Sequence, residues 1–359
     1  MSDNLVKISH MKIENYHAQQ EMNNILKLRE MLKSLPQFVV GFFRSLSDQT
    51  SALTRLGYAY DLRIFFTFLS EEIFDNIPVT EISAENMARI QSEEIEEFME
   101  YLSYYVPADN PDSHIKNAAL GKSRKLAAVR GIFKYLYRKK LIPANPSELV
   151  SFPKIHEKPI TTLEVNEIAK LLNEVDSGEN LTDHQKIFHE RTKLRDAAII
   201  TLLLGTGMRV SECVGLDIRD IDFEVNGLRV TRKGGDEMIL YFGDEVHDAL
   251  CAYLDQREEL TPLDGHENAL FLSLQNRRIT DRAIQNMVKK YASLITQLKN
   301  ISPHKLRSTF GTQLYAETGD IYLVANVLGH ADVNTTRKHY AKMDDSYRRR
   351  AANAVRLRE

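Results

Sequence analysis

The sequence predicts a mainly α-helical protein of two domains, with one small β-hairpin in the second domain. Apolar residues recur at helical spacing over most of the chain, and one short region alone is rich in β-forming residues. Four prolines fall between positions 143 and 159, where they interrupt the helical pattern and mark a linker. The 359 residues, 43% of them hydrophobic, suffice for two domains with substantial cores and exclude a disordered chain.

The first domain is expected to be entirely helical. Apolar residues at steps of three and four positions between 126 and 136 are typical of the buried stripe of a helix. The boundaries predicted from composition are an N-terminal extension over 1–34, a helical domain over 35–150 and a linker over 151–160. The helices expected before this buried stripe cover 25–35, 38–46, 53–70 and 84–105.

The second domain is expected to cover 161–340, followed by a basic tail over 341–359. Two short β-rich segments, 227–231 and 238–242, flank Gly234 and Gly235 and predict a hairpin. The helices expected around it cover 162–175, 184–204, 245–259, 281–296, 303–318 and 321–328.

Charge is close to balanced overall and strongly polarised locally. The chain has 47 Lys and Arg against 50 Asp and Glu, a formal charge of -3, so no global positive field indicates a polyanion partner. Residues 71–100 carry ten acidic residues and one basic residue, whereas residues 116–140 carry nine basic residues and no acidic one. The basic helix is either an ordinary solvated face or a surface that lies along a polyanion.

The cysteines, the first 20 residues and the apolar runs together predict the cellular location. Cys213 and Cys251 form neither a disulfide framework nor a zinc spacing, which favours a reducing compartment. Residues 1–20 are polar, and the longest apolar run, 197–204, is too short to span a bilayer. We therefore expect a cytoplasmic protein without a membrane partner.

Four segments of the second domain carry the groups that phosphoryl transfer needs. Two arginines, one lysine and two histidines suit the spread negative charge of a pentacoordinate phosphate, and a tyrosine hydroxyl nearby is a nucleophile. Each group alone has an ordinary interpretation, such as a surface arginine, a solvated turn lysine, a loop histidine or a half-buried tyrosine. The segments are Gly205–Glu212 (GTGMRVSE), Thr231–Gly235 (TRKGG), His304–Arg307 (HKLR) and Leu328–Tyr340 (LGHADVNTTRKHY).

Together these segments resemble the tyrosine recombinase (phage integrase) family in order and approximate spacing. The matching catalytic positions are Arg209, Lys233, His304, Arg307, His330 and Tyr340, with Glu212 as a supporting residue. In the first domain, 60–66 and 123–130 are similar to the core-binding helices of that family. Ser308 and Gly311 depart from its usual His and Ala. Within the family the chain is most similar to the Xer recombinases, of the single-protein XerS type.

The resemblance implies a fold, a mechanism and partners. It implies a C-shaped DNA clamp made of a helical, SAM-like core-binding domain and a catalytic domain, with Tyr340 forming a 3'-phosphotyrosyl link. It implies double-stranded DNA as partner, a monomer or dimer that becomes a homo-tetramer in the synaptic complex, and a regulatory partner such as a DNA translocase. It also implies that the tail docks on a neighbouring protomer and that neither a metal nor a cofactor is needed. The expected DNA contacts are Lys122, Arg124, Lys125, Arg130 and Arg232.

Four functions stay open from the sequence. Chromosome dimer resolution is favoured, and integration or excision of a phage or conjugative element is the alternative. A type IB topoisomerase-like enzyme shares the nucleophile but exchanges no partners. The last is a protein that only binds DNA, and the complete set of catalytic residues argues against it.

Overall fold

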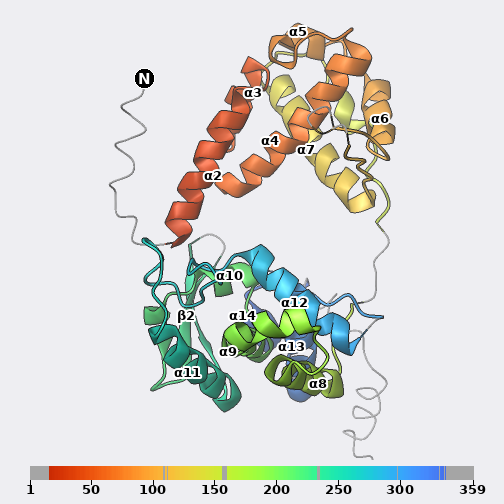
Figure 1. Cartoon of the computed structure of the whole chain (residues 1–359). Helices are drawn as coiled ribbons and strands as arrows, with labels where there is room; N and C mark the ends of the chain where they lie inside the picture. The colour runs from red at the N-terminus through yellow and green to blue at the C-terminus, as the bar shows by residue number, and fades with distance from the viewer. Residues whose placement is uncertain are drawn as a thin grey trace, which may run out of the picture. The chain divides into compact units, whose positions relative to one another are not determined.

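The chain forms two compact units, residues 1–157 and 158–359, in a computed structural model (Figure 1). The described residues are 16–107, 110, 112–155, 160–232, 235–296, 298–330, 332–334 and 336. Helices make up most of both units, and the described part of the second unit contains a three-stranded sheet. The predicted mainly α fold class with a small sheet is confirmed.

The described part of the first unit is helical throughout, apart from an isolated bridge between Tyr105 and Ile115. Two long helices, α2 and α4, run side by side, and α4 also packs against α7 (Figure 1). The elements are α2 (Tyr16–Leu32), α3 (Gln37–Ser45), α4 (Ala52–Phe68), η2 (Leu69–Ile73), η3 (Val79–Glu81), α5 (Ala84–Met87), α6 (Ser92–Tyr101), α7 (Ala119–Arg138) and η4 (Pro146–Glu148).

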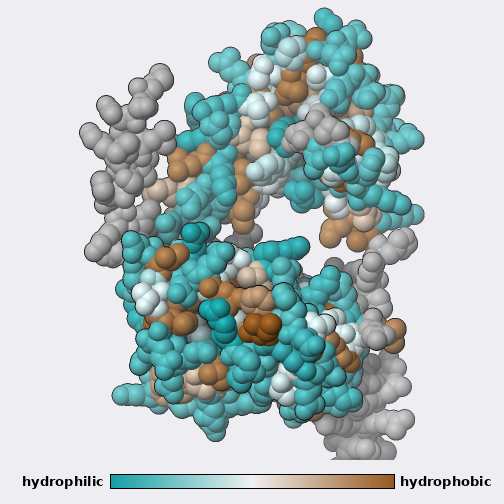
Figure 2. Space-filling view, in the orientation of Figure 1, coloured by the Kyte–Doolittle hydropathy of each residue, from teal (hydrophilic) through white to brown (hydrophobic). Residues whose placement is uncertain are grey.

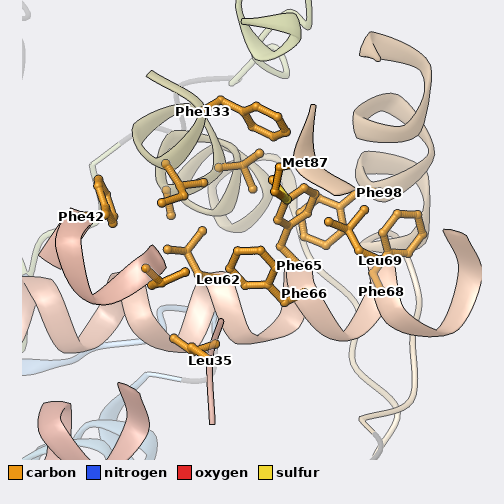
Figure 3. Packing of buried hydrophobic residues seen from close by; sticks show 14 of the residues in the cluster. Leu35, Phe42, Leu62, Phe65, Phe66, Phe68, Leu69, Met87, Phe98 and Phe133 are labelled. Atoms are coloured by element: carbon orange, nitrogen blue, oxygen red, sulfur yellow. The ribbon is translucent and has the colours of Figure 1, made fainter. Parts of the chain in front are cut away.

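Aromatic side chains fill the core of this unit. Phe65 lies at its centre, with its ring centroid 5.0 Å from that of Phe98 and 6.2 Å from that of Phe133, both in edge-to-face contact (Figure 3). The apolar stripe predicted for the basic helix is fully buried on α7. Its basic residues therefore lie around a helix whose inner face is fixed by the core.

The single helix expected over 84–105 is wrong, because the chain breaks it into α5 and α6. Ser83 and Asn86 form a capping box at the start of α5, and Gln91 and Glu94 form another at the start of α6. At α5 the side chains of Ser83 and Asn86 each accept a backbone N–H of the other residue, and at α6 Glu94 accepts the backbone N–H of Gln91. The restart is therefore specified locally, even though the apolar pattern runs on through Ile90.

The second unit places helices around the small antiparallel sheet, in the order β1-β2-β3. The hairpin pairs Gly227 with Tyr241 and Thr231 with Glu237, and β1 is a two-residue strand that the sequence analysis did not predict. The elements are α8 (Val165–Ser177), α9 (Asp183–Thr206), α10 (Val210–Gly215), η5 (Ile218–Asp220), β1 (Ile221–Asp222), β2 (Gly227–Thr231), β3 (Glu237–Tyr241), α11 (Asp244–Glu258), α12 (Asp281–Ile295), α13 (Pro303–Thr318) and α14 (Ile321–Leu328).

Helix α9 is the centre of the second unit. It contacts α8, α10, α11 and α13, and its last turns, 198–203, are buried. Leu163, just before α8, donates its backbone N–H to Thr309 Oγ1 on α13 at 3.0 Å. Helices α8, α9 and α13 are therefore packed together, and the site lies at the end of α9 and the start of α13.

The face of the two units in Figure 2 is mostly hydrophilic, with hydrophobic residues in small separate groups. Over the described residues, every helix is too short or too polar to cross a membrane.

Candidate active site

Arg209 is positioned by the turn between α9 and α10. Helix α9 ends at Gly207, which has a left-handed backbone with φ of 62°, and Arg209 is the N-cap of α10. A Cβ on Gly207 would lie 2.2 Å from Cδ1 of Phe310, so the close approach of α13 also requires glycine here. The sharp turn between the two helices therefore depends on the Gly-Thr-Gly segment.

Glu212 holds Arg209 at two points. Its Oε2 accepts the backbone N–H of Arg209 at 2.8 Å, and its Oε1 pairs with Nη1 of Arg209 at 2.7 Å. Glu212 is buried, whereas the Arg209 side chain is 36% exposed. The carboxylate is therefore an internal anchor, and the guanidinium that it orients stays open to solvent on one side.

Arg307 joins the ends of two helices from inside the unit. It is buried on α13, its Nη1 donates to the Gly207 carbonyl at 2.7 Å, and its Nη2 donates to the Leu328 carbonyl. Gly207 is the C-cap of α9, and Leu328 is the last residue of α14. Arg307 thus ties the Arg209 turn to the end of α14.

Three arginines converge on successive carbonyl groups at the end of α14. Arg232 Nη2 donates to Val327 O at 2.9 Å, Arg307 to Leu328 O, and Arg209 Nη2 to Gly329 O at 3.3 Å. The last carbonyls of a helix lack partners within it and carry a partial negative charge, so this end attracts cations. This role of α14 was not predicted from the sequence, although Gly329 after an apolar run is a helix-end signal.

His330 follows directly from this helix end. Its backbone N–H donates to Ala325 O at 2.9 Å, and its Nδ1 lies 2.7 Å from Oγ1 of the buried Thr336. Thr336 fixes the ring from the other side and was not singled out from the sequence. His304 lies on the first turn of α13 with an exposed side chain, three residues before Arg307.

The structure therefore brings Arg209, Glu212, Arg307 and His330 together and adds Arg232 to them. Lys233 and Tyr340 lie outside the described residues, so their place in this site stays a prediction. Among the described residues, no group of three or more His, Cys, Asp or Glu side chains is arranged to hold a metal ion.

The four basic residues of α7 that were expected to contact DNA all have partners within the first unit. Lys125 is buried and donates to Asn117 Oδ1 at 2.9 Å, and Lys122 donates to Ser103 Oγ at 2.6 Å. Arg130 donates to the carbonyls of Ser147 and Val150. Lys125 therefore does not lie on the surface as a DNA contact requires, because the buried side of α7 includes its position.

Arg124 pairs with a buried carboxylate. Its Nη1 lies 2.6 Å from Asp61 Oδ2, while its own side chain is 54% exposed. Burial raises the pKa of Asp61 to about 6, and the charges of Arg124 and Lys125 partly offset that rise. Arg124 is the one exposed residue among these four, and Asp61 holds its guanidinium against α4.

The comparisons with known proteins agree with the motif assignment. The model of the phage integrase family matches residues 145–346, more than half of the chain. Tyrosine recombinase XerC of Caldanaerobacter subterraneus subsp. tengcongensis is 34% identical over 340 residues, covering 91% of this chain and 89% of that protein. Tyrosine recombinase XerC of Chlorobaculum tepidum is 30% identical over 310 residues, covering 83% and 88%.

Solved structures share the fold at lower identity. The XerH site-specific recombinase bound to palindromic difH substrate, a post-cleavage complex, aligns with a TM-score of 0.62 at 22% identity, covering 84% of this chain and 80% of that one. The Tn1549 transposon integrase with circular intermediate DNA aligns with a TM-score of 0.60 at 20% identity, covering 88% and 98%. The Xer-like resemblance is confirmed, and the XerS type stays a prediction. The chain belongs to the phage integrase family, whose members are tyrosine recombinases that cut and rejoin DNA.

Proposed function

We propose that this recombinase acts at a specific double-stranded DNA site and resolves chromosome dimers, as an Xer-like enzyme. The observation that supports the proposal most is the convergence of Arg209, Arg307 and His330 at the end of α14. Such a set of donors matches the non-bridging oxygens of a phosphodiester, because a guanidinium fork binds phosphate oxygens in pairs.

Tyr340 is the proposed nucleophile. Its phenolate oxygen attacks the scissile phosphorus, a P–O bond to tyrosine forms, and the P–O bond to the 5'-oxygen breaks. Lys233 gives a proton to that leaving oxygen, and His304 takes part in proton transfer around the tyrosine. The freed 5'-hydroxyl then attacks the phosphotyrosine of the partner strand. The covalent link conserves the bond energy, so no ATP, metal or cofactor enters the scheme.

The remaining groups stabilise the negative charge of the phosphate. Arg209 and Arg307 donate to its non-bridging oxygens, and His330, with Thr336 fixing its ring, donates a further hydrogen bond. Glu212 acts through Arg209, which it holds at both the backbone and the side chain.

We further propose that the first unit grips the same duplex through α7, so that both units form a clamp. Phosphate contacts from exposed cations such as Arg124 provide affinity and salt dependence but little sequence information. The tail over 341–359 docks on a neighbouring protomer in a synaptic tetramer, and a DNA translocase is the proposed regulatory partner. The chain, of the XerS type, acts in the cytoplasm.

Covalent capture of DNA tests the proposal. The protein is mixed with fragmented genomic DNA from its source cell and quenched with detergent, and the attached fragments are sequenced. Recovery of one chromosomal site remote from any mobile element supports dimer resolution, whereas junctions that flank a mobile element identify an integrase or excisionase.

Two controls separate the competing functions. Tyr340→Phe is expected to bind the recovered site with nearly unchanged affinity and to attach no DNA, so attachment by this variant contradicts the nucleophile assignment. Strand exchange between two duplexes that carry the site distinguishes a recombinase from a topoisomerase-like enzyme, which only relaxes a supercoiled circle.

A further inference from the structure

Arg232 occupies a fixed place beside the phosphate-binding arginines. It directly follows β2, and its backbone N–H donates to Asp236 O at 2.7 Å, which closes the hairpin. From there its half-buried side chain reaches α14, where Nη2 donates to Val327 O at 2.9 Å. The hairpin and the helix end thus hold the two ends of this side chain.

Gly329 leaves the space that the Arg232 guanidinium fills. A Cβ on Gly329 would lie 1.1 Å from Nη1 of Arg232 and 2.0 Å from its Cζ, closer than any side chain permits. Gly329 also has φ of 63°, a backbone conformation that favours glycine, and any larger residue here would displace the Arg232 guanidinium. The Arg232 guanidinium therefore lies against Gly329, next to the carbonyl groups that accept hydrogen bonds from Arg209 and Arg307.

One donor of Arg232 lacks an acceptor. Its Nε is buried and has no hydrogen-bond partner among the described residues. Burial lowers the pKa of Arg232, the charge of Glu212 opposes that effect, and the charge of Arg209 adds to it. A buried charged donor without an acceptor is costly, so a negative charge bound beside this guanidinium would stabilise it.

The charges around Arg232 give the same indication. Arg209, Arg232 and Arg307 meet at one helix end, and Glu212 is the carboxylate that pairs with one of them there. Cations gathered in this way favour a bound anion, and a phosphodiester is the anion that the proposed reaction brings.

We propose that Arg232 is a third arginine ligand of the scissile phosphate, with Nη1 donating to a non-bridging oxygen while Nη2 stays on the Val327 carbonyl. The assignment rests on the proposed function of the site and adds a contact to it. It is more specific than a general DNA contact, because it places Arg232 on the phosphate that reacts. The alternative is a purely structural arginine that holds the end of α14.

The charge of the scissile phosphate separates these two roles. Cleavage is measured on two nicked duplexes carrying the captured site, one with the natural phosphate and one with a methylphosphonate at the scissile position. We expect Arg232→Ala to slow cleavage of the natural duplex about 10- to 100-fold, as for loss of a hydrogen bond between charged groups. On the uncharged methylphosphonate, the variant and the wild type should react at similar rates.

Two further variants control the experiment. Arg229 lies on β2, three residues before Arg232, and its 51% exposed side chain pairs with Asp220, so Arg229→Ala should leave both rates unchanged. Arg232→Lys keeps the charge without the fork and should give an intermediate rate on the natural duplex. If the wild type does not cut the methylphosphonate, DNA binding replaces cleavage as the measurement. The dissociation constants of Tyr340→Phe and of the double variant Tyr340→Phe, Arg232→Ala are then compared on both duplexes. The double variant should bind the natural duplex more weakly and the methylphosphonate duplex equally well.

Equal losses on both duplexes would show that Arg232 only supports α14, and no loss on the natural duplex would overturn the contact. Both results leave the proposed function intact. Failure of the wild type to form any covalent adduct would instead contradict the proposed function itself.

Discussion

Replacing Gly207 by alanine tests whether close packing of α13 sets the geometry of the Arg209 turn. The new Cβ would lie 2.2 Å from Cδ1 of Phe310, and the residue would keep φ of 62°. A left-handed alanine costs about 1 kcal/mol, and overpacking in a fixed core adds about 1 to 3 kcal/mol. The sum predicts a loss of about 2 to 4 kcal/mol in the free energy of opening of the second unit.

Gly319→Ala is the matched control for this change. Gly319 caps α13 with φ of 66°, and among the described residues nothing lies within 4 Å of the position of a Cβ there. Gly319→Ala therefore has the backbone strain of Gly207→Ala without the contact with Phe310. Its free energy of opening should fall by about 1 kcal/mol. The difference between the two variants isolates the contact with Phe310.

Amide hydrogen exchange read by mass spectrometry measures both losses within the full chain. Peptides from the last turns of α9 and from α13 should exchange about 10- to 100-fold faster in Gly207→Ala than in Gly319→Ala, at about tenfold for each 1.4 kcal/mol. Peptides from α4 in the first unit serve as the internal reference. Equal exchange in the two variants would refute the argument that Phe310 makes glycine necessary at 207.

Three further predictions concern single side chains. Lys233→Ala should slow cleavage, and a duplex with a 5'-thio leaving group, which needs no proton, should restore the rate; absence of rescue counts against the general-acid role. Glu212→Ala should lower the stability of the second unit by about 2 to 3 kcal/mol, and Glu212→Gln by less, in urea unfolding, because Glu212 accepts from both the backbone and the guanidinium of Arg209. The pKa of Asp61 is raised from 3.8 to about 6, so the folded state binds this proton more tightly than the unfolded state does. The free energy of unfolding should therefore fall by up to about 3 kcal/mol as pH rises from 4 to 6. Asp61→Asn should show a smaller fall over that range, and plots of unfolding free energy against pH that run parallel for the two proteins would contradict this.

The sequence predicted elements well where a local pattern determines them. The helix limits expected at 303–318 and 321–328 match α13 and α14, because Pro303, Gly319 and Gly329 mark their ends. The break between α5 and α6 was missed even though its capping residues are visible, since the apolar pattern was given more weight than the caps. The strand β1 has two residues, too few for any periodicity.

The sequence predicted residues of the site but not the contacts that hold them in place. The motifs identified Arg209 and Arg307, but contacts between residues about a hundred positions apart, such as Arg307 with Gly207, arise only from tertiary packing. The exposure predicted for Lys125 from its position on the helix was wrong. Lys125 lies beside the buried stripe and turns inward, because Asn117 accepts its hydrogen bond and Asp61 carries the opposite charge. Arg232 was expected only as a DNA contact, and its position against Gly329 was not foreseeable from either segment alone.

The end of α14 explains how several like charges gather before DNA arrives. Three guanidinium groups near one another repel, and Glu212 alone does not balance them. The carbonyl groups of Val327, Leu328 and Gly329 each accept from one of these arginines, so the negative end of the helix offsets the repulsion. A guanidinium has five N–H donors, and the one carbonyl contact of Arg232 does not exhaust them. Arg232 therefore needs little rearrangement when a phosphate binds, which is the condition under which fixed dipoles and charges stabilise a transition state most effectively.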